Sequence, residues 1–202
     1  MNLVNNFGSE IVQIAIDSIA MGLIDEGPLK IDLDDVPEEL RAKGSCFVTI
    51  YKGGNLRGCV GTIFPNKSLA EDISANAHNA AFNDKRFDEI DVDELLDGDV
   101  VVSVSVLSPL VKVDCANNDE LLTKITMGED GVVMIDGKIV SVFLPQVWDT
   151  IPDKRIFINE LKTKAGVDKN YWSDTVNFYK FKVDTVEADW PLDEYYEEDE
   201  EQ

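Results

Sequence analysis

Residues 56–62, with the sequence LRGCVGT, hold the side chains whose types and spacing could support chemistry. Strand alternation would place Arg57 and Cys59 on the same face, because successive side chains of a strand point to opposite sides. A guanidinium near a thiol lowers the pKa of the thiol, and it can also bind a carboxylate or phosphate through two hydrogen bonds. Gly58 and Gly61 permit close approach of a ligand or of another backbone. The segment is therefore a candidate nucleophilic or anion-binding site.

The same residues also have a purely structural interpretation. Cys59 could pack as a small hydrophobic side chain, and Arg57 could pair with one of the many acids of the chain. His78 is the single histidine, so neither a multi-histidine zinc site nor a second imidazole base exists in this sequence. Thiol catalysis would need His78 or a carboxylate beside Cys59. No metal-ligand motif or phosphate-binding glycine loop is present, and we expect no metal and no cofactor.

Four further residues are candidates for binding. Asp84 and Arg86 follow a predicted helix, where they could form a ligand clamp with Arg57 or a structural ion pair. Lys164 lies near a predicted helix C-terminus, where the helix dipole alone would favour its charge. Gln146 could line a pocket. The candidate binding residues are thus Arg57, Gly58, Gly61, Thr62, Asp84, Arg86, Gln146 and Lys164, and the candidate catalytic residue is Cys59.

Hairpins and short helices must position these residues. Residues 46–51 and 56–63 are predicted strands joined by a glycine turn, and residues 132–144 form a second hairpin. Ser68 and Glu71 have capping-box spacing and begin a helix expected over residues 69–82. The other expected elements are helices at 9–23, 92–96, 119–125 with Asn118 as its cap, 145–148 and 153–165, and strands at 100–107, 109–113 and 174–183. This order predicts an α+β fold with a largely antiparallel sheet and flanking helices.

The composition limits the classes of function. The chain has 18 basic and 40 acidic residues and a net charge of −22, and this field argues against binding to a nucleic-acid backbone. Three cysteines without paired spacing suggest neither a disulfide framework nor a metal site. No apolar run is long enough to span a bilayer, so we expect no membrane contact and a cytoplasmic location. Residues 191–202 are expected to form an acidic, disordered tail.

The order of the motifs resembles a known family. LRGCVGT at residues 56–62 is similar to the signature heptapeptide of the AMMECR domain family, with Val60 where isoleucine is usual. Residues 76–87, 102–109, 143–148 and 164–166 agree with the family in order and spacing, with Lys85 where proline is frequent. The resemblance covers nearly all of residues 7–187.

This resemblance implies a domain over residues 1–190 with two unequal lobes around a cleft that the signature faces. The larger lobe would be built from both chain ends and the smaller from the middle. The resemblance brings no established reaction. In prokaryotes the family is similar to protein A of the AmmeMemoRadiSam system, so the resemblance implies a Memo-like protein and a radical S-adenosylmethionine enzyme as partner candidates. We expect a binding or adaptor component; the alternative is an enzyme that acts on a small anionic or carbonyl-bearing substrate with Cys59 and Arg57.

Overall fold

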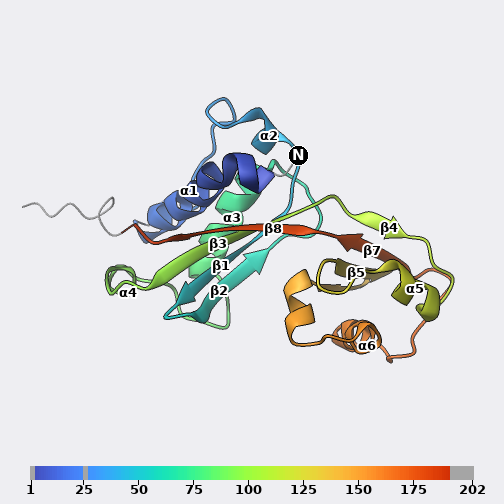
Figure 1. The fold of residues 1–202 in the computed structure, drawn as a ribbon. Coiled ribbons are helices and arrows are strands. Elements are labelled where there is room, and N and C mark those ends of the chain that lie inside the picture. Colours follow the sequence, from blue (N-terminus) through green and yellow to red (C-terminus); the bar gives the residue numbers. More distant parts are fainter. Residues whose placement is uncertain (1–2, 25–26, 192–202) are drawn as a thin grey trace, which may run out of the picture. The chain divides into compact units, whose positions relative to one another are not determined.

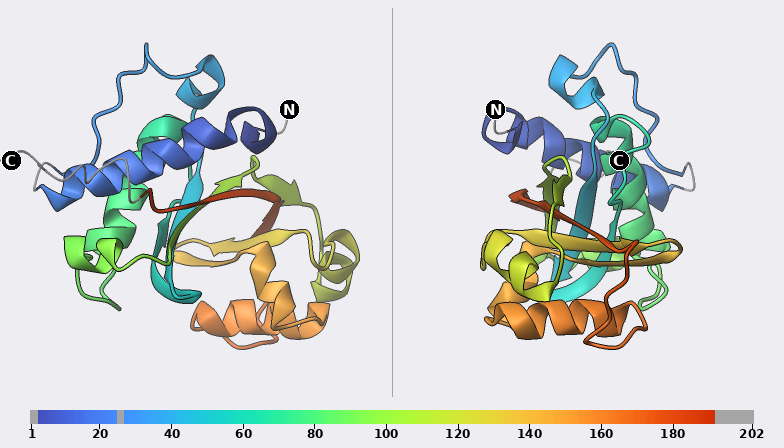
Figure 2. Two further views of the ribbon diagram at one scale, coloured as in Figure 1. Left: turned by 60° about the vertical axis from the view of Figure 1, so that its left-hand side comes forward. Right: turned by 90° about the vertical axis from the view of Figure 1, so that its right-hand side faces the viewer.

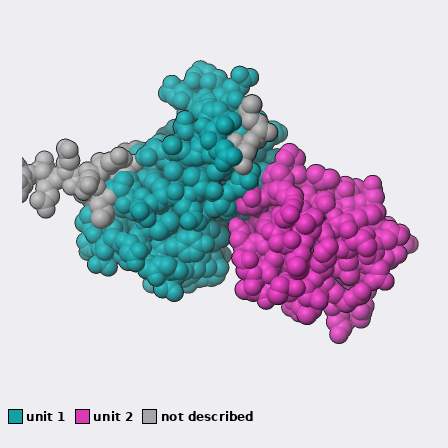
Figure 3. Space-filling model, in the orientation of Figure 1, with its two compact units in different colours: residues 1–107, 184–202 teal, residues 108–183 magenta. Residues whose placement is uncertain are grey.

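A computed structural model describes residues 3–24 and 27–191 of the chain. The chain divides into two compact units, unit 1 from residues 1–107 and 184–202, and unit 2 from residues 108–183 (Figure 3). Each unit contains helices and one antiparallel sheet, which confirms the predicted α+β class. The predicted acidic tail lies outside the described residues, apart from Pro191.

Unit 1 contains a four-stranded sheet with the strand order β2-β1-β3-β8 (Figure 1). Its strands are β1 (Cys46–Lys52), β2 (Asn55–Gly61), β3 (Val100–Leu107) and β8 (Val183–Asp189). Its helices are α1 (Leu3–Leu23), α2 (Glu38–Arg41), α3 (Leu69–Phe82) and α4 (Val92–Leu96). Helices α1 and α3 pack against each other and against the sheet (Figure 2).

The hydrophobic core of unit 1 lies between the sheet and these helices. Alternate residues of β1, namely Val48 and Ile50, are buried there, together with Leu95 of α4. The predicted capping box is confirmed, because the Ser68 hydroxyl accepts from the Glu71 N–H and the Glu71 carboxylate accepts from the Ser68 N–H. The start of α3 is thereby fixed beside the hairpin that carries the signature segment.

Unit 2 has its own sheet with the order β4-β7-β5-β6. Its strands are β4 (Val111–Val113), β5 (Gly131–Asp136), β6 (Ile139–Phe143) and β7 (Asn177–Phe181), and its helices are α5 (Asn118–Lys124), the 3-10 helix η1 (Pro145–Asp149) and α6 (Lys154–Lys164). Its core includes Trp148 stacked on Phe157, with ring centroids 3.6 Å apart. The predicted Gly166 stop of the last helix is confirmed by its φ of +78°.

Two local predictions are wrong. Asn117, not Asn118, caps α5, since its side chain accepts from the Glu120 N–H at 2.9 Å. The expected strand 174–183 is two strands, because the chain passes from β7 to β8 at Lys182 and thereby changes sheet. The helix expected over 9–23 is present within α1, which also includes a short helical segment from Leu3 that is separated by non-helical backbone angles at Phe7.

The two ends of the unit 2 segment are joined to each other by hydrogen bonds between Ser108 and Lys182. The Ser108 N–H donates to the Lys182 carbonyl, and the Lys182 N–H donates to the Ser108 hydroxyl, both at 2.9 Å. The segment therefore begins and ends at the same place. None of the described helices is long and apolar enough to cross a membrane.

Candidate functional site

The signature segment lies on β2, which is an edge strand of the unit 1 sheet. Gly58 pairs with Ile50 and Leu56 pairs with Tyr51, so Arg57 is the extra residue of a β-bulge. Gly58 faces α3, where a Cβ would come within 2.1 Å of the Ala80 carbonyl oxygen. This close packing explains the first glycine of the signature.

The bulge separates the two side chains that strand alternation predicted on one face. Arg57 forms a two-pronged ion pair with Glu94 of α4, from Nε to Oε1 at 2.6 Å and from Nη2 to Oε2 at 2.8 Å. Cys59 pairs with Thr49, whose hydroxyl donates to its Sγ at 3.3 Å, and Thr49 alternates with the core residues of β1. The prediction of a shared face is therefore wrong, and Arg57 has the structural ion pair that was its alternative interpretation.

Asp84 and Arg86 bind the backbone of Cys59 on the outer edge of β2. The Cys59 N–H donates to Asp84 Oδ2 at 2.9 Å, and Arg86 Nη2 donates to the Cys59 carbonyl at 3.2 Å. Arg86 also holds Asp84 through Nε–Oδ1 at 2.9 Å and Nη2–Oδ2 at 2.6 Å. These hydrogen bonds from Arg86 are the main reason why the pKa of Asp84 lies far below its usual range. We name this three-residue arrangement the edge clamp; it covers backbone groups that an open edge strand would expose.

Gly61 and Thr62 have structural contacts at the end of β2. A Cβ on Gly61 would come within 2.2 Å of the Phe47 ring. The Thr62 hydroxyl accepts from Asn76 Nδ2 of α3 at 3.2 Å, and the Thr62 N–H donates to the Cys46 carbonyl at 2.9 Å.

Sequence reasoning missed the buried polar network beneath this strand end. The Asp72 side chain accepts from the Cys46 N–H and from Asn76 Nδ2, both at 3.0 Å. Burial is the main cause that raises the pKa of the Cys46 thiol. Asp72 and Asn76 are four residues apart on a helix with an alanine-rich face, and this spacing was the available signal.

A hollow of about 390 Å³ lies beside β2, and we call it the basic hollow. It is lined by Arg57, Lys85, Arg86, Phe87 and Asp88. The guanidinium carbons of Arg57 and Arg86 lie 5.8 and 5.5 Å from the centroid of the Phe87 ring. Lys85 is exposed. The arrangement brings two guanidinium groups over one aromatic ring, with Lys85 and Asp88 completing the lining of the hollow.

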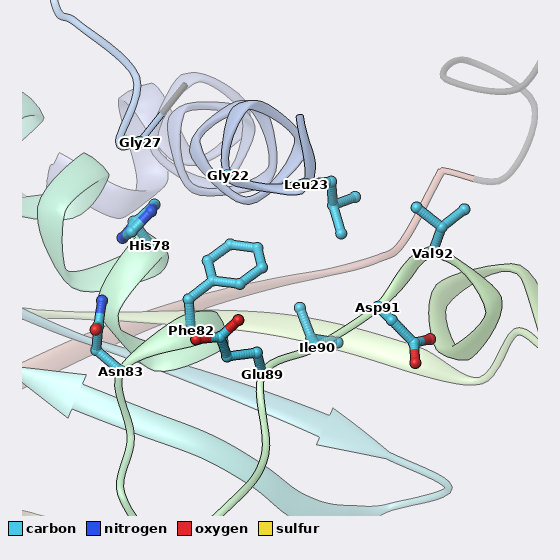
Figure 4. A pocket seen from close by; sticks show the side chains of 10 residues that line it. All are labelled: Gly22, Leu23, Gly27, His78, Phe82, Asn83, Glu89, Ile90, Asp91 and Val92. Atoms are coloured by element: carbon cyan, nitrogen blue, oxygen red, sulfur yellow. The ribbon is translucent and has the colours of Figure 1, made fainter. Parts of the chain in front are cut away.

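His78 lies in a different hollow, which is lined by α1, α3 and the loop before α4 (Figure 4). Its ring is 5.0 Å from the Phe82 ring, and partial burial is the main cause that lowers its pKa. Cys59 instead contacts Thr49 on the sheet face that lies away from α3. The structure therefore does not bring the histidine and the thiol together. Among the described residues, no group of three or more His, Cys, Asp or Glu is placed to hold a metal.

Gln146 and Lys164 belong to unit 2. Gln146 is exposed on η1. Lys164 donates to the Val142 carbonyl at 2.9 Å and lies 5.1 Å from the centre of the Phe143 ring, so it ties α6 to β6. Their role in binding stays a prediction, as does the cleft expected between the lobes.

The fold and the clamped signature strand define a class of protein, namely a two-unit α+β protein with LRGCVGT on a sheet edge. The AMMECR1 family model matches residues 12–186, and the chain belongs to this family. Protein MJ0810 of Methanocaldococcus jannaschii is 32% identical over 176 residues, covering 83% of this chain and 85% of that protein. A Thermotoga maritima protein is 36% identical over 156 residues, covering 75% and 82%.

A solved structure has the same fold. The crystal structure of the uncharacterized protein PH0010 from Pyrococcus horikoshii matches with a TM-score of 0.80 and 30% identity, covering 90% of this chain and 91% of that one. The family match and the solved structure together establish the fold of this chain.

Proposed function

We propose that this chain is a binding or adaptor protein that holds an acidic group of a partner in the basic hollow beside β2. The observation that supports this function is a hollow lined by three basic residues and one acid, Asp88, in which Arg57 and Arg86 lie over the Phe87 ring, in a chain with a net charge of −22. Such a local group of basic side chains would attract a carboxylate or phosphate.

The two arginines are already oriented for this role. Arg57 uses Nε and Nη2 for Glu94, and Arg86 uses Nε and Nη2 for Asp84 and for the Cys59 carbonyl. A guanidinium carries five N–H donors, so each arginine has donors left for a bound anion. Because both side chains are held in place, binding would cost little side-chain entropy.

A binding role also fits the absence of a complete catalytic set in the signature segment. Arg57 binds Glu94, and Asp84 binds Arg86 and a backbone N–H. Arg86 does lie near the Cys59 thiol, but a guanidinium is a cation and cannot act as the general base that thiol catalysis needs.

A pull-down with purified proteins tests the proposal. The candidate partners are a Memo-like protein and a radical S-adenosylmethionine enzyme from the same genome. Lys85→Glu should weaken the binding of at least one of them by roughly tenfold or more, since it reverses a charge facing the acidic group. Lys43→Glu, an equal charge change at an exposed residue outside the hollow, is the matched control. Unchanged binding of both partners by folded Lys85→Glu and Arg86→Gln variants would overturn the proposal.

The alternative function is an enzyme or enzyme subunit acting on a small anionic or carbonyl-bearing substrate with Cys59 and Arg57. The hydrogen bond from the Thr49 hydroxyl to the Cys59 Sγ favours it, because a donor stabilises a thiolate. Iodoacetamide labelling at pH 7 distinguishes the two functions. A Cys59 that reacts faster than the same cysteine in the unfolded chain supports chemistry, and a slower one supports the binding role.

A further inference from the structure

Two adjacent hollows lie near the C-terminal end of α1, on a part of unit 1 that the proposed function does not use. Their volumes are about 410 and 400 Å³, and both are lined by Leu23 and Val92. Each volume is at the lower end of the range for ligand pockets in proteins. The shared wall makes the two hollows neighbouring compartments of one surface.

The first hollow is acidic. It is lined by His78, Asn83, Glu89 and Asp91 around the Phe82 ring, and none of its lining residues is Lys or Arg (Figure 4). The Glu89 carboxylate and the Phe82 ring both line this hollow (Figure 4). A hollow lined by carboxylates and an aromatic ring suits a cation, because the negative charge and a ring face both attract it.

The polar neighbours of Glu89 have other partners. Asn83 Nδ2 donates to Asn79 Oδ1 at 3.1 Å, and Asp91 Oδ1 accepts from the Glu94 N–H at 2.8 Å. Glu89 is exposed at the hollow. The Glu89 charge also acts on His78, whose pKa is lowered mainly by burial, so a cation in this hollow would meet the Glu89 and Asp91 carboxylates beside that histidine.

The second hollow is apolar. Besides the shared residues, its lining consists of Ala20, Met21, Ile24 and Leu29 and one acid, Asp17, whose Oδ1 accepts from Gln13 Nε2 at 2.9 Å. The Ile24 side chain at its rim is 64% exposed, and Val92 is 36% exposed. Large apolar side chains exposed together mark a surface on which another molecule packs.

We propose that the two hollows together dock a short segment of a partner protein, with a Lys or Arg side chain in the acidic hollow and a large apolar side chain in the neighbouring one. The charge of Glu89 and Asp91 selects the basic residue, and the Ile24 rim selects the apolar one. A protein segment fits because it presents two different side chains at a fixed spacing and leaves its backbone in solvent. This surface has the opposite charge preference to the basic hollow, so it would bind a different group and does not depend on the proposed function.

The test is fluorescence polarisation with the full chain and labelled nine-residue peptides. Each peptide carries one arginine and one leucine in an alanine and serine background, with the two separated by one to four positions. At least one spacing should bind saturably, and the same peptide with glutamine in place of arginine should bind roughly tenfold more weakly or not at all, since it loses a charge-assisted hydrogen bond.

Variants of the chain locate the binding. Glu89→Gln should weaken the best peptide by roughly tenfold, and Ile24→Ser should weaken it severalfold. Glu39→Gln, at an exposed acid of α2, is the matched control and should have no effect. Lys85→Glu should also leave the peptide bound, so failure of either proposal is distinguishable from failure of the other.

Two outcomes would overturn the inference. One is that no spacing binds, or that the bound peptide ignores both Glu89→Gln and Ile24→Ser. The other is that pentylammonium binds as tightly as the best peptide with the same sensitivity to these variants. That result would make the surface a site for small organic cations and not for a protein segment.

Discussion

Asp84 accepts a hydrogen bond from the backbone N–H of Cys59 at 2.9 Å, although the two residues are 25 positions apart in the chain. Asp84 thus holds Cys59 through its backbone, while the Cys59 thiol accepts a hydrogen bond from the Thr49 hydroxyl. The loop after α3 pairs with the edge of β2 in place of another strand. Asp84 and Arg86 therefore have a structural role, the binding of the β2 backbone, that needs no ligand.

Asp84→Asn should destabilise the protein by about 1–3 kcal/mol, because it removes the charged partner of Arg86 and weakens the acceptor of the Cys59 N–H. The Asp84 side chain is only 7% exposed, so solvent cannot replace these contacts. Urea unfolding measures the effect. The control is Asp34→Asn, which removes an ion pair to Arg41 at 3.8 Å with Asp34 96% exposed, and which should cost less than about 1 kcal/mol. Equal effects of the two variants would contradict the edge clamp.

Acid should remove the contribution of Asp84 below about pH 4. The pKa of Asp84 is lowered in the folded state, mainly by hydrogen bonds from Arg86, so the unfolded state binds more protons at acidic pH. The stabilisation is therefore complete above the unfolded pKa and falls as the pH approaches the folded one. Urea midpoints between pH 5 and pH 2.5 should fall more steeply for the natural chain than for Asp84→Asn. Parallel curves would show that Asp84 does not contribute.

Gly58→Ala should destabilise the fold by about 1–3 kcal/mol, as expected for overpacking. The new Cβ would lie 2.1 Å from the Ala80 carbonyl oxygen, and this neighbour is backbone that cannot rotate away. Thermal unfolding measures the loss. Gly8→Ala in α1 is the control, since its Cβ meets only the Val186 side chain at 3.3 Å, and it should change stability by less than about 1 kcal/mol. A Gly58→Ala variant as stable as the natural chain would show that β2 and α3 can move apart.

The cysteines should differ in reactivity. Cys46 is completely buried with a raised pKa, so native protein should leave it unmodified by iodoacetamide while Cys59, which is partly exposed, is labelled. In urea both should react. Peptide mass spectrometry at successive labelling times gives the labelling rate of each cysteine. Labelling of Cys46 before Cys59 in the native state would contradict the burial of Cys46.

Two predictions that rest on local signals are confirmed. The capping box at Ser68 and the glycine turn after Lys52 depend on residues within four positions of each other, and both elements lie at the predicted places. The bulge at Arg57 could not be predicted, because it depends on how β2 pairs with Ile50 and Tyr51 of the other strand. A one-residue register shift reverses which face a side chain occupies.

The partners of the site residues were also beyond local sequence reasoning. Glu94 is 37 positions from Arg57 and is one of 40 acidic residues, so nothing in the spacing selects it. The change of sheet at Lys182 was hidden for a similar reason, since continuous strand-forming residues on both sides predict one strand. Both features depend on contacts between residues that are far apart in the sequence.

The hydrogen bonds between Ser108 and Lys182 have a consequence for how this family can vary. Because residues 108–183 start and finish side by side, they form a topological insertion into the chain of unit 1. Such an inserted segment can be lengthened, shortened or exchanged without changing the course of β2, the strand that carries LRGCVGT. Relatives that differ in unit 2 would then keep the same clamped edge, and a chimera carrying the middle segment of another family member is a direct way to assign binding to one unit or the other.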